Sequence, residues 1–251
     1  MTTSGDCSGK VSEVWRRLER VTDPELDESV TDMDFITEVH VDADDHVHIG
    51  FRLPTYWCAA NFAFMMADDM RSAVMDLPWV KGVTIRLGEH MYADTINRGV
   101  AEGRSFQETF GEEADGDLDE VRRTFLLKAF QRRQEALLLH LGAAGLAPAE
   151  LVRLRIADLA SLPVDDDGRK LSNRYMERRP VAGPADADAM AFITAEGEPL
   201  QLDGFEIYVK ALRRVRVNAE FNGALCRGLL SARFDTTTPL SPPTIRAPGH
   251  P

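Results

Sequence analysis

The clearest pattern along the chain is a strict alternation of apolar and polar residues over residues 46–53. The apolar positions are Val47, Ile49, Phe51 and Leu53. A period of two is typical of a strand that is buried on one face. A second apolar series, Phe35, Val39 and Val41, precedes the acidic turn of residues 42–45. The two segments therefore predict a pair of neighbouring strands.

Helical periodicity flanks this strand pair on both sides. Residues 10–21 carry apolar side chains at helical spacing and predict an amphipathic helix. Residues 58–76 are rich in Ala, Met and Phe and predict a second helix, after which VTIRL, residues 83–87, predicts a third short strand. Residues 94–111 are expected to be helical in part. This order predicts an α+β fold in which a small three-stranded sheet packs with helices.

The second half of the chain is predicted to be mainly helical. Helical patterns cover residues 118–145, 147–162 and 203–230. Between them, residues 163–171 are predicted to form a turn, residues 178–189 a loop, and residues 191–202 a short hairpin around Glu196 and Gly197.

These changes of pattern suggest a division of the chain into five parts. We expect a disordered tail over residues 1–10, an α+β domain over 11–110, a linker over 111–119, a mainly helical domain over 120–234, and a Pro-rich tail over 235–251. The acidic, glycine-containing linker marks the boundary between the two folded parts.

Composition and charge narrow the classes of function. The formal charge is −12, so the chain lacks the net basic character typical of non-specific nucleic-acid binding, and no nucleic-acid partner is expected. No apolar stretch reaches the roughly 18–20 residues that span a bilayer, so no membrane association is expected. The N-terminus lacks the pattern of a secretory signal, and we expect a cytoplasmic protein.

The three cysteines, Cys7, Cys58 and Cys226, are far apart and form no CxxC motif. They therefore predict neither a disulfide framework nor a self-contained zinc site. Cys58 lies where a strand is followed by a helix, and backbone N–H groups at a helix start favour the reactive thiolate. The alternative is a small, inert core residue. Cys226 is expected in the core.

Three segments in order resemble one family. They are VTDPELDESVTDMDFI from residue 21, LPTYWC from residue 53, and GEHMYADTIN from residue 88. This series is similar to the iron–sulfur cluster assembly domain of SufT, PaaD and the cytosolic iron–sulfur targeting proteins. The resemblance covers residues 11–110 and implies the α+β fold described above.

The resemblance also implies which residues act. Cys58, Asp23, Glu25 and His90 would be the candidate metal or cluster ligands, and the motif would be supported by Pro24, Thr55, Asp94 and Asn97. Asp23 could instead simply shape a turn. His40, His46 and His48 could form a separate metal site, but they lie on the polar face of the strands, and solvent-facing side chains are the preferred interpretation.

The function that follows is that of an accessory factor, not an enzyme, which assembles or delivers an iron–sulfur or other metal centre to a client metalloprotein. A metal-dependent oxygenase component is the client class suggested by the resemblance. A transient iron–sulfur cluster or iron would be the cargo, and a single cysteine suggests that a homodimer, carboxylates or an external thiol complete its ligands. The alternative is a client-specific folding chaperone or scaffold that binds no metal itself.

Overall fold

The computed structural model describes residues 4–113 and 117–234, and the chain forms two compact units. The first unit is Met1–Leu118 together with Gly223–Pro251, and the second is Asp119–Asn222. The sequence placed all of residues 120–234 in one helical domain. In the structure, residues 223–234 instead belong with the first unit, because their side chains pack on its core.

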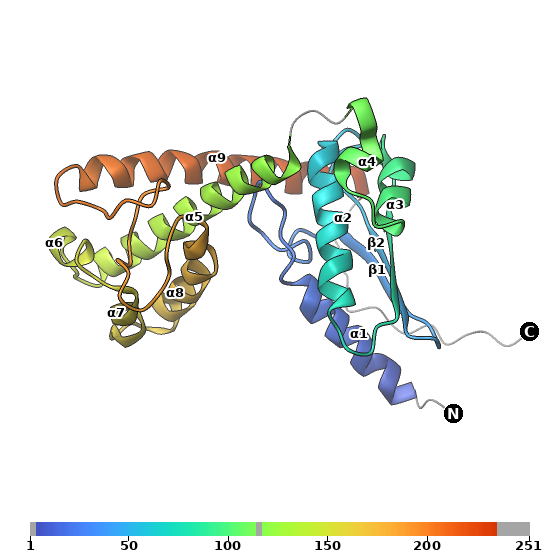
Figure 1. The fold of residues 1–251 in the computed structure, drawn as a ribbon, viewed down its shortest axis with the longest axis horizontal. Coiled ribbons are helices and arrows are strands. Elements are labelled where there is room, and N and C mark those ends of the chain that lie inside the picture. Colours follow the sequence, from blue (N-terminus) through green and yellow to red (C-terminus); the bar gives the residue numbers. More distant parts are fainter. Residues whose placement is uncertain (1–3, 114–116, 235–251) are drawn as a thin grey trace, which may run out of the picture. The chain divides into compact units, whose positions relative to one another are not determined.

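The first unit is built around a mixed three-stranded sheet with strand order β1-β2-β3 (Figure 1). β1 (Ile36–Val41) and β2 (His46–Phe51) pair antiparallel, with Val39 opposite Ile49. β3 (Gly82–Leu87) pairs parallel to β2, with Ile85 also opposite Ile49. The alternating side chains of all three strands are buried on one face, as the period of two predicts.

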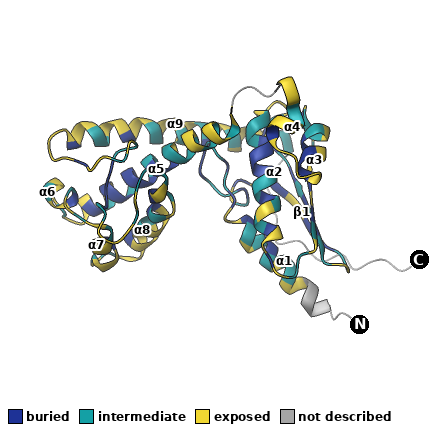
Figure 2. Cartoon of the chain, in the orientation of Figure 1, coloured by how far each residue is buried: buried dark blue, intermediate teal, exposed yellow. Residues whose placement is uncertain are grey.

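Helices cover that apolar face. α2 (Ala60–Met75) follows β2 and makes the crossover that a parallel strand pair requires. α2 and α3 (Ala93–Ala101) pack on β3, and α1 (Ser4–Leu18) packs on β1. Short helix α4 (Phe106–Phe110) and a 3₁₀ turn, Gly111–Glu113, follow. Figure 2 shows the buried positions along β1 and on α2. The predicted α+β fold is confirmed.

Helix α1 begins earlier than the sequence pattern indicates. The expected disordered tail, residues 1–10, overlaps a helix that starts at Ser4. The apolar stripe starts only at Val11, so the preceding turns carry no periodic signal. Lys10 lies in those early turns, and its Nζ is 2.7 Å from Asp45 Oδ1 in the turn between β1 and β2. The predicted Pro-rich tail, 235–251, lies outside the described residues.

The polar face of the sheet carries the three histidines of the first two strands. His46 Nε2 is 2.8 Å from Thr84 Oγ1, and His48 Nε2 is 3.4 Å from Asp42 Oδ2. The rings of His46 and His48 lie 4.8 Å apart, and those of His40 and His48 lie 6.0 Å apart. His40 is exposed and His46 and His48 are partly exposed, in agreement with the solvent-facing interpretation.

The second unit is mainly helical, as predicted, with helices α5 (Leu118–Ala143), α6 (Pro148–Leu151), α7 (Ile156–Ser161), α8 (Asp166–Arg178) and most of α9 (Phe205–Phe234). The single helix predicted over residues 147–162 is wrong. Residues between α6 and α7 leave the helix because Arg155 forms a β-bridge with Met190 and Leu154 O accepts from Ala191 N–H. Backbone pairing to a distant segment therefore overrides the local helical pattern.

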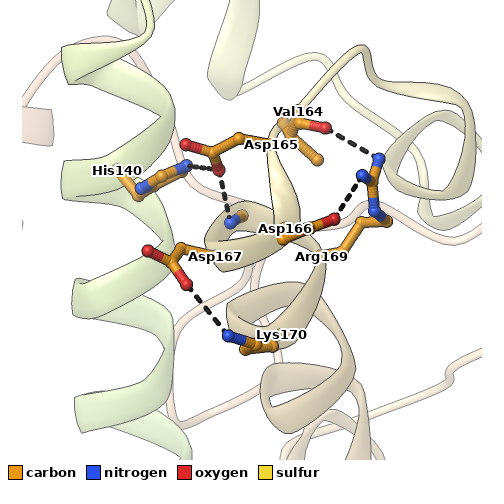
Figure 3. A network of polar contacts seen from close by, with 8 residues as sticks. His140, Val164, Asp165, Asp166, Asp167, Arg169 and Lys170 are labelled. Carbon is orange, nitrogen blue, oxygen red and sulfur yellow. Dashed lines mark hydrogen bonds and ion pairs between the residues drawn. The ribbon is translucent and has the colours of Figure 1, made fainter.

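The turn predicted over residues 163–171 is largely a helix. Asp165 caps α8, with its Oδ1 accepting from Gly168 N–H at 2.8 Å and lying 3.1 Å from His140 Nε2 (Figure 3). Both the cap and the His140 ring lower the pKa of Asp165. The sequence DDDG has turn composition, but the same residue types are favoured where a helix begins.

The hairpin predicted over residues 191–202 forms as a turn with a single isolated bridge and without regular strands. Its turn is present, with Gly197 at φ 90° and a bridge between Ile193 and Pro199. Backbone bonds from Thr194 N–H to Glu198 O at 2.7 Å and from Leu200 N–H to Phe192 O at 3.2 Å join its two sides, and a side chain adds to them. Gln134, which is fully buried, donates from Nε2 to Ile193 O at 2.9 Å and accepts from Ile193 N–H at 3.2 Å. None of the helices in the described part of the chain is long and apolar enough to cross a membrane.

Candidate functional site

The first motif segment forms a closed loop after α1. A bridge joins Thr22 to Ser29, and Asp23 is buried between them. Its Oδ1 accepts from Glu25 N–H at 2.9 Å and from Leu26 N–H at 2.8 Å. Asp23 therefore shapes the turn. Pro24 occupies the following position, where a turn favours the fixed φ of proline. Glu25 is half-buried in the same loop.

The second segment carries Cys58. The thiol is half-buried and lies two residues before Ala60, the first residue of α2. Thr55 Oγ1 is 3.1 Å from Cys58 Sγ, so the supporting role predicted for Thr55 corresponds to a direct contact. The intervening Tyr56 and Trp57 are 51% and 72% exposed, which is unusual for aromatic side chains.

The third segment holds the second in place through His90. His90 Nε2 is 2.8 Å from Cys58 O, and Nδ1 accepts from Tyr92 N–H at 3.1 Å. An accepting Nδ1 requires the proton on Nε2, so the ring is neutral and donates to the Cys58 carbonyl. Burial and the nearby Arg233 both lower the pKa of His90. Since both ring nitrogens are occupied, the geometry favours a positioning role for His90 over the predicted ligand role.

Asn97 and Asp94 support the third segment from α3. Asn97 bonds both backbone groups of Leu87, accepting from its N–H at 2.7 Å and donating to its carbonyl at 3.0 Å. These bonds fix the end of β3, directly before Gly88 and His90. Asp94 lies in the first turn of α3, where a negative charge is favourable.

Replacing Asn97 with alanine should destabilise the first unit by about 1–3 kcal/mol, because the two backbone groups of buried Leu87 lose their partners. Urea unfolding followed by tryptophan fluorescence measures this loss, since Trp15, Trp57 and Trp79 all belong to the first unit. Arg98→Ala, at the exposed neighbouring position, is the control and should change the free energy of unfolding little. Equal effects of the two substitutions would contradict the assignment.

The last turns of α9 contact all three segments. Arg227 Nη1 is 2.6 Å from Glu28 Oε2, in the first segment. Arg233 donates to Leu53 O at 3.4 Å and to Glu89 O at 2.9 Å, in the second and third segments. Leu230, between the two arginines, is buried in the same core as the sheet. Residues 223–234 therefore form a structural part of the motif region.

Cys226 is also part of this stretch of α9, although the sequence indicated only that it would lie in the core. It is half-buried and packs against the same core cluster as Cys58. Burial, followed by the charges of Asp23, Cys58 and Glu25, raises the pKa of the Cys226 thiol to about 11. The available signal was the helical spacing of Cys226, Leu230 and Phe234, which predicts a common face but not what that face contacts.

The donor atoms of the motif are not arranged as a ready-made metal site. Over residues 4–113 and 117–234, no group of three or more His, Cys, Asp or Glu side chains is placed to hold a metal ion. What the geometry offers is a half-buried thiol on a loop held by Thr55 and His90, next to the exposed rings of Tyr56 and Trp57. This is a small α+β scaffold that presents a cysteine loop.

Comparison with known proteins identifies this class. The family model described as iron–sulfur cluster assembly protein matches residues 12–86. The Fe–S protein maturation auxiliary factor YitW of Bacillus subtilis (strain 168) is 31% identical over 70 residues, which cover 28% of this chain and 67% of that protein. A crystal structure of the domain of unknown function DUF59 from Bacillus anthracis aligns with 40% of this chain and 96% of its own, at 15% identity and a TM-score of 0.32.

The chain belongs to the iron–sulfur cluster assembly protein family, so the predicted resemblance is confirmed. Membership supports a role in the maturation of iron–sulfur proteins. The matched region, residues 12–86, contains Asp23, Glu25 and Cys58, whereas His90 and Asn97 lie just beyond it. Cys226 and the second unit also lie outside the matched region.

Proposed function

We propose that the first unit is a non-enzymatic factor that assembles or delivers an iron–sulfur centre to a client protein, with Cys58 as the thiol that holds the cargo. The observation that carries this proposal is the construction of the Cys58 loop. The Cys58 carbonyl is fixed by His90, the Cys58 thiol contacts Thr55, and the residue stays partly exposed. A purely structural cysteine needs neither this access nor these partners.

A docking surface for the client surrounds the same thiol. Tyr56, Trp57 and Met91 are all about half-exposed or more, and Met91 N–H donates to Tyr56 O at 2.9 Å. Exposed aromatic and methionine side chains are enriched where proteins bind each other. A client that approached Cys58 would bury this patch. As an extension of the family resemblance, we propose metal-dependent oxygenase components as the client class. We also propose that the chain is a homodimer when it takes up its iron–sulfur cargo.

A second candidate is a client-specific scaffold that binds no metal. It is favoured by the second unit, which has a hydrophobic core of its own outside the matched family region. In this alternative Cys58 is a packing residue and the exposed aromatic patch alone contacts the client.

Replacement of Cys58 with serine separates the two candidates. The purified full-length chain is incubated anaerobically with ferrous iron and sulfide, desalted, and analysed for bound iron, labile sulfide and visible absorption. Apo-ferredoxin then serves as an acceptor probe. We expect Cys58→Ser to lower bound iron and transfer by at least about 10-fold, because a thiolate ligand is lost. Cys7→Ser is the matched control and should retain both. Equal loading of wild type and Cys58→Ser would show that Cys58 does not hold the cargo, and absence of bound iron from both chains would leave the scaffold as the function.

A further inference from the structure

A cavity opens between α3 and α4, within the first unit. Its volume is 510 Å³, within the range of about 300–1,000 Å³ that is typical of binding sites for small molecules. Besides one glycine, it is lined by Thr95, Arg98, Glu102, Arg104, Thr109 and Phe110. All of these residues lie beyond the matched family region, and only Thr95 belongs to a motif segment.

Close packing of the two helices forms one wall of the cavity. Gly99 is buried on α3 and also lines the cavity. A Cβ atom at this position would overlap the side chain of Thr109 on α4. Thr109 is itself held, because its hydroxyl donates to Ser105 O at 2.7 Å. The cavity therefore follows from the packing of α3 on α4, which glycine at position 99 allows.

Two arginines give the cavity an excess of positive charge. Within residues 4–113 and 117–234, the Arg98 guanidinium makes no ion pair or hydrogen bond. Arg104 Nη2 lies 2.6 Å from Glu102 Oε2. The lining therefore carries two guanidinium groups against one carboxylate, in a chain whose formal charge is −12. Such a lining favours anions, since guanidinium groups bind phosphate and carboxylate oxygens through paired hydrogen bonds.

We propose that this cavity binds a small molecule through a phosphate group, whose oxygens Arg98 and Arg104 bind. A phosphate monoester carries close to two negative charges at neutral pH, so it matches two guanidinium groups better than a single carboxylate does. Thr95 lies three residues before Arg98 on the same face of α3, and its hydroxyl would donate a further hydrogen bond. Thr109 would only accept, because its proton is already donated to Ser105 O.

The Phe110 ring indicates what the rest of the ligand is. Its centroid lies 4.7 Å from that of Phe106 and 5.4 Å from that of Tyr92, so neighbouring rings hold it in place. A flat ring can stack on such an aromatic side chain. A nucleotide combines a phosphate group with a flat ring, and it is the class of ligand that fits this lining best. Free inorganic phosphate is the other source of the same chemistry.

Ligand binding in this cavity would not depend on the proposed function, since no thiol, iron or client takes part in it. The ligand would join α3 to α4, and α3 carries Asn97, which fixes the end of β3. A ligand that binds only the folded chain stabilises that chain by mass action. Binding should therefore raise the free energy of unfolding of the first unit.

Isothermal titration calorimetry of the full-length chain in a phosphate-free buffer tests the class of ligand. Adenosine monophosphate should bind at least about 10-fold more tightly than adenosine, because the phosphate supplies the charged hydrogen bonds. Tighter binding of adenosine monophosphate than of inorganic phosphate would support a nucleotide, and equal binding would support free phosphate as the source. Absence of binding by both phosphate compounds, or equal binding of adenosine and its monophosphate, would overturn the proposal.

Arg98→Gln and Arg104→Gln test the residues that bind the phosphate. Both positions are exposed, so both variants should fold, and each should weaken binding of adenosine monophosphate at least about 10-fold. Arg86→Gln, at an exposed position on β3 outside the cavity, removes the same charge and should leave the affinity unchanged. Adenosine monophosphate should also raise the urea midpoint of Arg86→Gln more than that of Arg98→Gln. Equal losses of affinity in all three variants would mean that only net charge matters, which would overturn the site.

Discussion

Replacing Arg179 with methionine is expected to destabilise the second unit by about 2–5 kcal/mol. The Arg179 side chain is 1% exposed, and burial lowers the pKa of its guanidinium. It donates to three backbone carbonyls, those of Ala191 at 3.1 Å, Gly183 at 3.2 Å and Met190 at 2.8 Å. Methionine fills part of the volume but donates nothing, and each buried acceptor left without a donor costs about 1–3 kcal/mol.

The expected value stays below three full penalties because one carbonyl keeps a partner. Tyr175 donates its hydroxyl proton to Ala191 O at 2.6 Å and also contacts Gln134 Oε1 at 3.0 Å. Gly183 O and Met190 O are therefore the acceptors that lose most. Both belong to the segment between α8 and α9, which has little regular structure and relies on such side-chain bonds.

Urea unfolding followed by far-ultraviolet circular dichroism measures the effect of Arg179→Met, because most of the second unit is helical. Tryptophan fluorescence reports the first unit in the same samples. Arg174→Met, at an exposed position one turn earlier on α8, is the control and should change the dichroism transition little. If Arg179→Met unfolds like this control, the buried guanidinium does not organise the segment.

Arg179 also illustrates which parts of the fold a sequence can predict. The sheet was predictable because alternation reports burial on one face, and Val47, Ile49 and Phe51 are all buried. The break between α6 and α7 was not, because Arg155 leaves the helix to pair with Met190. Arg179 lies in the segment RRPVAG, whose composition predicts a loop. Its burial depends on carbonyls that fold around it, and periodicity carries no information about them.

The candidate site was likewise predictable from the sequence only in part. The order of the three motif segments indicated that Cys58 and His90 belong together, and the structure joins them through the Cys58 carbonyl. The motif did not indicate how His90 acts, because the sequence alone does not distinguish a histidine that binds a metal from one that positions a loop. Cys226 was expected in the core, but which core it packs on was not predictable, since its neighbours in the fold are far from it in sequence and no family motif contains it.

Replacing His90 with phenylalanine is expected to cost about 2–4 kcal/mol in the first unit and to lower cargo loading at Cys58. Phenylalanine keeps the ring volume at this 4%-exposed position, but it leaves Cys58 O without its donor and Tyr92 N–H without its acceptor. His90→Gln can donate and accept, and should recover part of both losses. Recovery of loading by glutamine would support positioning, because a ligand role requires the imidazole.

The pH dependence provides an independent signature of the same histidine. Its folded pKa is lowered from 6.5, so below about pH 6.5 the unfolded chain takes up a proton that the folded chain still refuses. The free energy of unfolding of the wild type should therefore fall as the pH drops through this range. The loss due to His90 is complete once the pH is below the folded pKa. His90→Gln should lose this part of the dependence, whereas His40→Gln, on the exposed sheet face, should keep it. Urea unfolding by tryptophan fluorescence at about pH 7.5 and about pH 5.5 measures the difference. Equal slopes for wild type and His90→Gln would mean that the pKa of His90 is the same in the folded and unfolded chains, which would contradict the lowered pKa of the buried imidazole.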